Sequence, residues 1–123
     1  MAHPKVLAVE DDDDLRFLYE TFLRTEGLEV VTARDAREGL RLLDEGPDVV
    51  LLDLMLPGMD GYEFLEELRR RREHRDTTVI VLSAAIPPGR HRVPGADATI
   101  RKPFEFDGLL RAIEGLSHPT VRG

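Results

Sequence analysis

Short apolar runs alternate along the chain with segments whose apolar residues recur at helical spacing. Five runs predict strands, at residues 6–9, 29–33, 48–53, 78–82 and 98–101. The third, DVVLLD, is continuously apolar between its acids, as expected of a strand buried on both faces. Strands that alternate with helices indicate βαβ units, a parallel sheet and an α/β fold with helices on both faces.

The predicted helices begin at residues that can cap them and carry an apolar face. The first is expected to start at a cap on Asp14, to end at Gly27, and to bury Leu15, Leu18, Phe22 and Leu23. The second starts at a cap on Asp35 and ends at Gly46. A third covers residues 62–74, with its acids first and its arginines last, as the helix dipole favours. The closing helix covers residues 105–116.

One segment interrupts the alternation. A helix is expected between the fourth and fifth strands, yet this stretch contains Pro87, Pro88, Gly89, Pro94 and Gly95. Proline removes a backbone donor and clashes with the preceding turn of a helix. We therefore expect the fourth helix to be shortened to about one turn or replaced by a loop.

Length and composition limit the possible classes of protein. The 123 residues predict one domain over 1–123, and the absence of cysteine excludes disulfide, thiolate–zinc and iron–sulfur sites. No apolar run is long enough to span a membrane and no secretory signal is evident, so a cytoplasmic protein without a membrane partner is expected. The net charge of −7 argues against direct nucleic-acid binding.

Charged and hydroxyl side chains follow four of the five strands. Glu10 and Asp11 follow the first, Asp53 the third, and Lys102 the fifth, while Ser83 ends the fourth. Ligands of an open parallel sheet bind at the carboxyl ends of its strands, so these side chains are expected to meet. Oxygen ligands suit Mg²⁺, and a carboxylate beside a metal, a hydroxyl and an ammonium is suited to phosphoryl transfer.

Motifs in these positions resemble those of the response-regulator receiver domains of two-component signalling. They span nearly the whole chain in the order of that family, at 9–12 (VEDD), 51–61 (LLDLMLPGMDG), 81–84 (VLSA), 95–97 (GAD) and 101–104 (RKPF). The resemblance implies a flavodoxin-like receiver fold, a doubly wound five-stranded parallel sheet with strand order 2-1-3-4-5.

The resemblance also implies a metal site and a phosphorylation site. Asp53 would accept the phosphoryl group, and Asp11 and Asp53 would ligate Mg²⁺ with the backbone carbonyl of Met55. Glu10 would act through a bound water. The donor would be a phosphohistidine on a sensor histidine kinase or a phosphotransfer protein, and the downstream protein is not indicated.

Three further residues would contact the phosphoryl group. The Ser83 hydroxyl and the Ala84 amide would bind its oxygens, and Lys102, expected to precede a cis proline, would pair with its charge. The domain would catalyse its own phosphorylation and dephosphorylation and no other reaction. Ser83 would also act as a switch position together with residue 99, where the family usually has an aromatic ring and this chain has Thr99.

Two alternatives stay open. A degenerate receiver, acting as a phosphorylation-independent interaction module, is favoured by Thr99 and the proline-rich segment. A phosphohydrolase of the haloacid-dehalogenase type would carry a second acid two residues after its nucleophile, where this chain has Met55. Asp12, Asp13 and Asp14 are interpreted as capping and solvated charge, and no histidine is expected to bind a metal.

Overall fold

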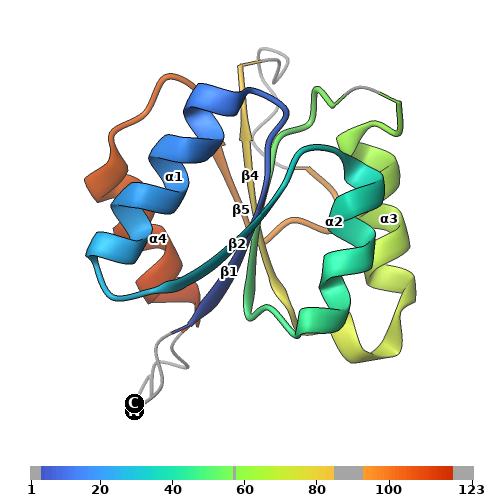
Figure 1. Ribbon diagram of the computed structural model, residues 1–123. Helices are drawn as coiled ribbons and strands as arrows, with labels where there is room; N and C mark the ends of the chain where they lie inside the picture. The colour runs from blue at the N-terminus through green and yellow to red at the C-terminus, as the bar shows by residue number, and fades with distance from the viewer. Residues whose placement is uncertain (1–3, 57, 85–92, 118–123) are drawn as a thin grey trace.

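A five-stranded parallel sheet lies between two layers of helices in the computed structural model, which describes residues 4–56, 58–84 and 93–117 (Figure 1). The strand order is β2-β1-β3-β4-β5, which confirms the predicted α/β fold and topology. The strands are β1 (Lys5–Val9), β2 (Glu29–Ala33), β3 (Val49–Leu52), β4 (Thr78–Ser83) and β5 (Ala98–Arg101).

Two helices cover each face of the sheet. One face carries α1 (Asp13–Thr25) and α4 (Phe106–Ser117), and the other carries α2 (Ala36–Leu42) and α3 (Gly61–Arg70), as Figure 1 shows. Two short 3₁₀ turns follow α2 and α3, at Leu43–Glu45 and Arg72–His74.

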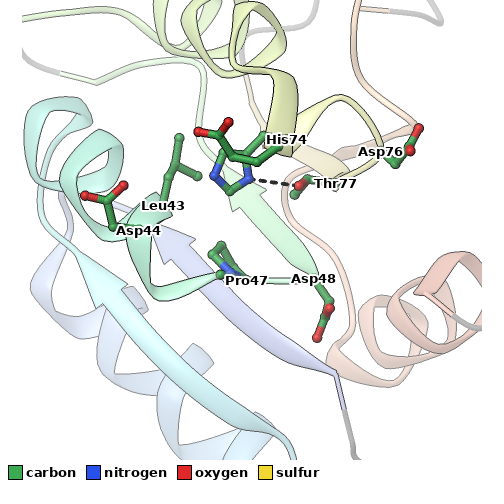
Figure 2. Close-up of a pocket in the computed structure, with 9 residues that line it drawn as sticks. Leu43, Asp44, Pro47, Asp48, His74, Asp76 and Thr77 are labelled. Atoms are coloured by element: carbon green, nitrogen blue, oxygen red, sulfur yellow. Dashed lines mark hydrogen bonds between the residues drawn. The ribbon is translucent and has the colours of Figure 1, made fainter.

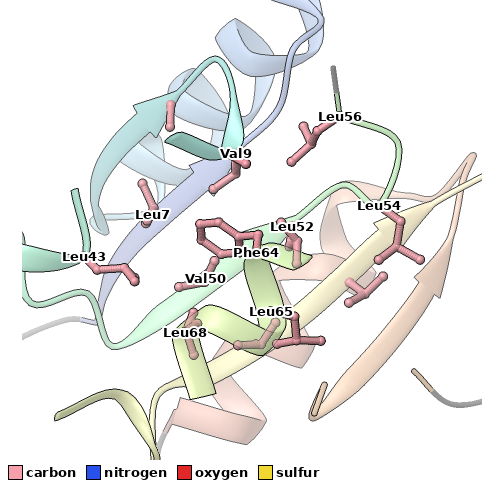
Figure 3. Close-up of a cluster of buried hydrophobic side chains, with 14 of the residues drawn as sticks. Leu7, Val9, Leu43, Val50, Leu52, Leu54, Leu56, Phe64, Leu65 and Leu68 are labelled. Atoms are coloured by element: carbon pink, nitrogen blue, oxygen red, sulfur yellow. The ribbon is translucent and has the colours of Figure 1, made fainter. Parts of the chain in front are cut away.

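Alternate residues of each strand enter opposite cores. In β1, Val6 and Ala8 pack toward α1 and α4, whereas Leu7 and Val9 pack toward α2 and α3. All four are at most 1% exposed, which explains why the central strands are continuously apolar in sequence. Figure 3 shows the core between the sheet and the helices α2 and α3, where the ring of Phe64 from α3 lies against the sheet.

The N-cap of the first helix lies two residues earlier than predicted. Asp12, not Asp14, is the N-cap, and its Oδ1 accepts a hydrogen bond from the Leu15 amide at 2.9 Å. Asp13 and Asp14 instead occupy the first turn, where their negative charges interact favourably with the positive end of the helix dipole.

The buried face of α1 also differs from the prediction at one position. Leu18 is 48% exposed, whereas Tyr19 is 1% exposed and packs beside Leu23 in the core. Tyr19 and Leu23 are four residues apart and follow the helical repeat, which turns Leu18 away from the sheet. The prediction counted apolar side chains and therefore missed the tyrosine.

The third helix is shorter than predicted. It ends at Arg70, because Arg71 adopts an extended conformation and its guanidinium donates to the carbonyl of Leu40 on α2. Along α3, Glu66 pairs with Arg70 at 3.1 Å and Glu67 pairs with Arg71 at 3.4 Å. His74, predicted at the helix end, lies in the following 3₁₀ turn.

The fourth helix was predicted to be shortened or replaced by a loop, and this segment falls mostly on residues 85–92, which lie outside the described residues. Val93, where the description resumes, is 5% exposed and joins the core between the sheet, α2 and α3.

Gly61 seats the start of α3 against the backbone that follows β3. A Cβ at this position would lie 2.6 Å from the Leu54 Cα and 2.7 Å from the Asp53 carbonyl oxygen. The Gly61 amide also donates to the Leu54 carbonyl at 3.0 Å. The close approach therefore fixes the segment that carries Asp53 to the first turn of α3.

We expect Gly61→Ala to lower the free energy of unfolding by about 2 kcal/mol, since backbone atoms must shift to admit the methyl group. Urea denaturation measures this change. Gly115→Ala is the matched control, because nothing lies within 4 Å of a Cβ there and alanine is the better helix former. The control should gain about 0.5 kcal/mol, and equal losses in both variants would contradict the packing argument.

Candidate functional site

The carboxyl ends of the strands bring the predicted residues to one edge of the sheet. Glu10 and Asp11 follow β1, Asp53 follows β3, Ser83 ends β4 and Lys102 follows β5. Because β1, β3, β4 and β5 are adjacent and parallel, residues distant in sequence become neighbours here.

The Lys102 ammonium group links two of these carboxylates. Its Nζ lies 2.9 Å from Oε1 of Glu10 and 3.1 Å from Oδ2 of Asp53. Its backbone amide donates to the Ser83 carbonyl at 3.1 Å, and the Lys102–Pro103 peptide bond is cis, as predicted. The lysine was expected to pair with a phosphoryl group; in this structure it pairs with Glu10 and Asp53.

Asp53 is held by both of its carboxylate oxygens. Oδ2 accepts from Lys102, and Oδ1 accepts from the Met55 amide at 2.9 Å. The residue is 8% exposed, so its carboxylate is accessible only from the edge of the sheet. The sequence reasoning gave Met55 a role through its carbonyl oxygen and missed its amide, although a turn amide two residues after an aspartate is a recognised Asx-turn donor.

Glu10 is the most deeply buried acid of the group. It is 2% exposed; its Oε2 accepts from the Asp12 amide at 3.2 Å, and its carbonyl accepts from Arg16. Burial raises the pKa of Glu10, and the charge of Asp53 adds to this effect, against the opposing influence of Lys102. The ionised form of Glu10 is therefore stabilised by the hydrogen-bond donors beside it, Lys102 and the Asp12 amide.

The pKa of Lys102 moves in the same direction for the opposite reason. Burial by itself would lower the pKa of Lys102, but the hydrogen bonds and charges of Glu10 and Asp53 outweigh it and raise that pKa. The ammonium form is therefore secured at neutral pH.

Glu10, Asp11 and Asp53 form a set of carboxylates suited to a hard cation. Each offers one oxygen, and these oxygens all lie within 4.8 Å of one another. Oxygen donors of this kind fit Mg²⁺, which is usually held by one or two carboxylates and several waters. Asp11 is exposed, so the edge of the site is open to an ion and its water ligands.

The remaining predicted residues lie beside this cluster or one strand away. Ser83 is fully buried at the end of β4, and Ala84, which follows it, is exposed. Thr99 lies in β5, at the edge of the sheet, opposite Val81 of β4, and is partly buried. A hollow of about 310 Å³ adjoins Lys102 and is lined also by Leu15, Ala84, Pro103, Phe104 and Phe106.

A cavity of about 470 Å³ lies at the opposite edge of the sheet, away from these residues. Its lining includes Asp48 and Thr77, which precede β3 and β4, and His74 (Figure 2). The Nδ1 of His74 lies 3.0 Å from the Thr77 hydroxyl, which gives this buried histidine a structural partner.

Comparisons with known proteins agree with the geometry. The family model of the response regulator receiver domain matches residues 6–114. The chain belongs to this family. Receiver domains are components of two-component systems and interact with histidine kinases and downstream effectors.

Relatives identified by sequence match this chain over different shares of their own length. PilG of Pseudomonas aeruginosa is 32% identical over 114 residues, which cover 89% of this chain and 84% of PilG. The transcriptional regulatory protein CpxR of Klebsiella pneumoniae is 39% identical over 121 residues, which cover 93% of this chain and 50% of CpxR. The receiver therefore spans most of PilG but only about half the length of CpxR.

Solved structures confirm the receiver fold. The chemotaxis response regulator CheY4 of Vibrio cholerae aligns with a TM-score of 0.86 and 30% identity, over 94% of this chain and 99% of that chain. The receiver domain of the sensor histidine kinase PA1611 from Pseudomonas aeruginosa aligns with a TM-score of 0.85 and 28% identity, over 94% and 98%. That structure has a magnesium ion coordinated in its active-site cleft. Among the described residues of the present chain, no helix is long and apolar enough to cross a membrane.

We expect Lys102→Met to lower the free energy of unfolding by about 2 kcal/mol at neutral pH, because Glu10 is left buried without its cation. The value is below that of a fully buried pair because the lysine side chain is 18% exposed. The raised pKa of Glu10 means that the folded variant takes up a proton as the pH falls, so the deficit should shrink toward about pH 4.

Toward alkaline pH the deficit should persist. Because the pKa of Lys102 is raised, the wild-type ammonium group stays charged until the pH exceeds the pKa of an ordinary lysine. Its contribution to the free energy of unfolding is lost only above that pH. Urea denaturation from acidic to alkaline pH measures both parts of this dependence. Lys5→Met, at the only other lysine, is the control: its partners Glu29 and Glu45 are exposed, so the loss should stay below about 1 kcal/mol. If the loss in free energy of unfolding caused by Lys102→Met did not shrink as the pH falls, this interpretation would be contradicted.

Proposed function

We propose that this receiver accepts a phosphoryl group on Asp53 from a phosphohistidine of a histidine kinase or a phosphotransfer protein, with Mg²⁺, and signals to a downstream protein. The observation that carries the proposal is the convergence of Lys102, Glu10 and Asp53 beside the exposed Asp11. A buried ion pair adds little net stability compared with apolar side chains in its place, even though removing the lysine alone is costly, and the arrangement is suited to a reaction in which charge arrives at one carboxylate.

The reaction requires no external base. A carboxylate oxygen of Asp53 attacks phosphorus, the P–N bond of the donor breaks, and its electron pair returns to the imidazole nitrogen. The product is an acyl phosphate on Asp53. In dephosphorylation, water attacks phosphorus and gives up a proton, the P–O bond to Asp53 breaks with its electron pair returning to the carboxylate, and inorganic phosphate leaves.

The surrounding residues would position the phosphoryl group and balance its charge. Lys102 would exchange a carboxylate oxygen for a phosphoryl oxygen, a movement of one flexible side chain. The Ser83 hydroxyl and the Ala84 amide would bind further oxygens at the end of β4. The Met55 amide already holds one oxygen of Asp53, which fixes the direction of the nucleophile.

Four residues would hold the cation. Asp11, Asp53 and the Met55 carbonyl would be direct ligands, and Glu10 would bind through a water. When bound, Mg²⁺ offsets the negative charge that collects on the phosphoryl oxygens. The magnesium ion in the PA1611 receiver supports this assignment for a related fold.

The proposed activity is confined to the domain itself. We infer self-phosphorylation and self-dephosphorylation of Asp53, without turnover of other substrates, and a cytoplasmic location remains a prediction. Thr99 has no ring to rotate between buried and exposed positions, so the output would differ from the aromatic switch that the family usually carries. Ser83 can still close on a phosphoryl oxygen.

The degenerate receiver is the second candidate. Thr99 favours it, because the usual switch residue is missing from β5. The position and pairing of Asp53, Glu10 and Lys102 support the phosphorylated form instead. The dehalogenase-type phosphohydrolase has less support, since the residue two positions after Asp53 is Met55.

Incubation with a small acyl phosphate should add one phosphoryl group to the wild-type domain in a Mg²⁺-dependent manner, as measured by intact-protein mass spectrometry. Asp53→Asn should abolish the addition, because no nucleophilic carboxylate remains. Asp14→Asn, at an exposed acid of the first turn of α1, should react like wild type. Absence of phosphorylation in a folded wild-type domain would favour the degenerate receiver.

Mg²⁺ should also stabilise the domain without any phosphoryl donor. At a concentration about tenfold above its Kd, the ion should raise the free energy of unfolding by about 1.4 kcal/mol. Asp11→Asn should lose most of this gain, because an exposed ligand is removed while the fold is left intact. Thermal denaturation with and without Mg²⁺ measures the effect, and equal stabilisation of both proteins would exclude Asp11 as a ligand.

A further inference from the structure

The motif GAD, at residues 95–97, lies directly before β5, at the opposite end of that strand from the candidate site. Its aspartate makes two hydrogen bonds to the start of β4. The Asp97 amide donates to the Val79 carbonyl at 2.8 Å, and the Asp97 Oδ2 accepts from the Val79 amide at 2.8 Å. Val79 is fully buried, so its amide needs an acceptor within the protein. The side chain of Asp97 supplies that acceptor, in place of a strand carbonyl.

Arg69, near the end of α3, holds Asp97 and the turn that precedes it. Its Nη2 lies 3.1 Å from the Asp97 Oδ2 and donates to the Gly95 carbonyl at 2.7 Å, and its Nε donates to the same carbonyl at 2.9 Å. Its Nη1 donates to three carbonyls of the segment before β4, those of His74, Arg75 and Thr77. One guanidinium group therefore joins the end of α3 to the segments that lead into β4 and β5.

The strand β5 has few buried side chains to fix its position in the sheet. It is a four-residue strand at the edge of the described sheet, beside β4, and its residues are partly buried or exposed. All four residues of β3, by contrast, are buried. The register of a strand is set largely by the side chains that enter the core, so it is weakly specified where few are buried. The hydrogen bonds at Asp97 therefore have an important part in setting the register of β5.

The register of β5 decides where Lys102 lies. Pairing with β4 runs from Ala98 opposite Ile80 to Arg101 opposite Ser83. The Lys102 amide then donates to the Ser83 carbonyl at 3.1 Å. A slip of one residue would move this position by about 3.3 Å and turn its side chain to the other face of the sheet. The distances of 2.9 and 3.1 Å from the Lys102 Nζ to the two carboxylates of the site would then be lost.

We propose that Asp97 is a positioning residue for Lys102, with Arg69 as its support. By closing the first link between β4 and β5, Asp97 sets the register that brings the Lys102 ammonium group to the acids at the other end of the strand. The inference rests on the proposed function only for its effect on phosphoryl transfer. The placement of Lys102 is a property of the folded domain and can be tested without any phosphoryl group.

The oxygen of Asp97, rather than its charge, is the feature that sets the register. The Asp97 side chain is 43% exposed, and an ion pair this exposed contributes little. The Val79 amide needs only an oxygen at the position of Oδ2, which an asparagine side chain also offers. Asp97→Asn keeps this acceptor and removes the charge, Asp97→Glu keeps the charge and displaces the acceptor, and Asp97→Ala removes both.

Amide hydrogen exchange at the two lysines tests the role of Asp97. The chain contains only Lys5 and Lys102, so labelling with ¹⁵N-lysine gives two amide signals in an NMR spectrum, which Lys5→Arg assigns. Under native conditions Asp97→Ala should speed exchange of the Lys102 amide about tenfold, because the end of β5 opens more often. Asp97→Asn should stay within about threefold of wild type, and Asp97→Glu should resemble the alanine variant.

The Lys5 amide is the internal control. It lies in β1, two strands away from β5, and donates to the Asp48 carboxylate at 2.9 Å, so its exchange rate should be the same in every variant. Asp76→Ala, at an exposed aspartate of the segment before β4, should leave both lysines unchanged.

Three outcomes would overturn the proposal. In Asp97→Ala, the Lys102 amide could exchange at the wild-type rate, or both lysine amides could exchange faster by the same factor. In the third, Asp97→Asn would exchange as fast as Asp97→Ala, which would assign the effect to charge. If Asp97→Ala does not fold, the comparison of Asp97→Asn with Asp97→Glu decides between acceptor and charge.

Phosphorylation by acetyl phosphate provides a second measurement. At equal Mg²⁺ concentration, Asp97→Ala should take up the phosphoryl group about tenfold more slowly than wild type, because a displaced lysine no longer meets the phosphoryl oxygens. Asp97→Asn should react at nearly the wild-type rate, and a wild-type rate for Asp97→Ala would overturn its role in the reaction. If wild type takes up no phosphoryl group, the proposed function fails, whereas exchange of the Lys102 amide still decides whether Asp97 sets the position of the lysine.

Discussion

The balance between one ammonium group and two nearly buried carboxylates is the interaction on which this site depends. Lys102 stands within 3.1 Å of both Glu10 and Asp53. Ionised groups lose much of their hydration at such positions, and pairing recovers only part of that loss. Compared with apolar side chains, such an arrangement adds little net stability, and its charges are better explained by a chemical role at the site.

The fold supplies the rigid frame for this balance. Both faces of the sheet are buried under helices, so the side chains of the central strands are fixed by packing, and function is left to the strand ends (Figure 1). Gly61 anchors the chain directly after Asp53, and the Lys102 amide ties the end of β5 to Ser83. Two strands that are not adjacent, β3 and β5, can thereby place a carboxylate and an ammonium group in contact.

The fold was predictable from sequence because burial on two faces leaves a strong apolar signal. The start of α1 was not, because consecutive aspartates from 11 to 14 have equal capping ability, and the choice of Asp12 involves its amide bond to Glu10. The end of α3 was not, because the contact between Arg71 and the Leu40 carbonyl joins residues 31 positions apart. Local pattern does not encode such contacts.

The candidate site shows the same division. Its residues were predictable, since each lies at the end of a predicted strand, whereas the hydrogen bonds and ion pairs between them were not. That Lys102 binds Glu10 as well as Asp53, and that the Met55 amide holds Asp53, follow only from distances in three dimensions.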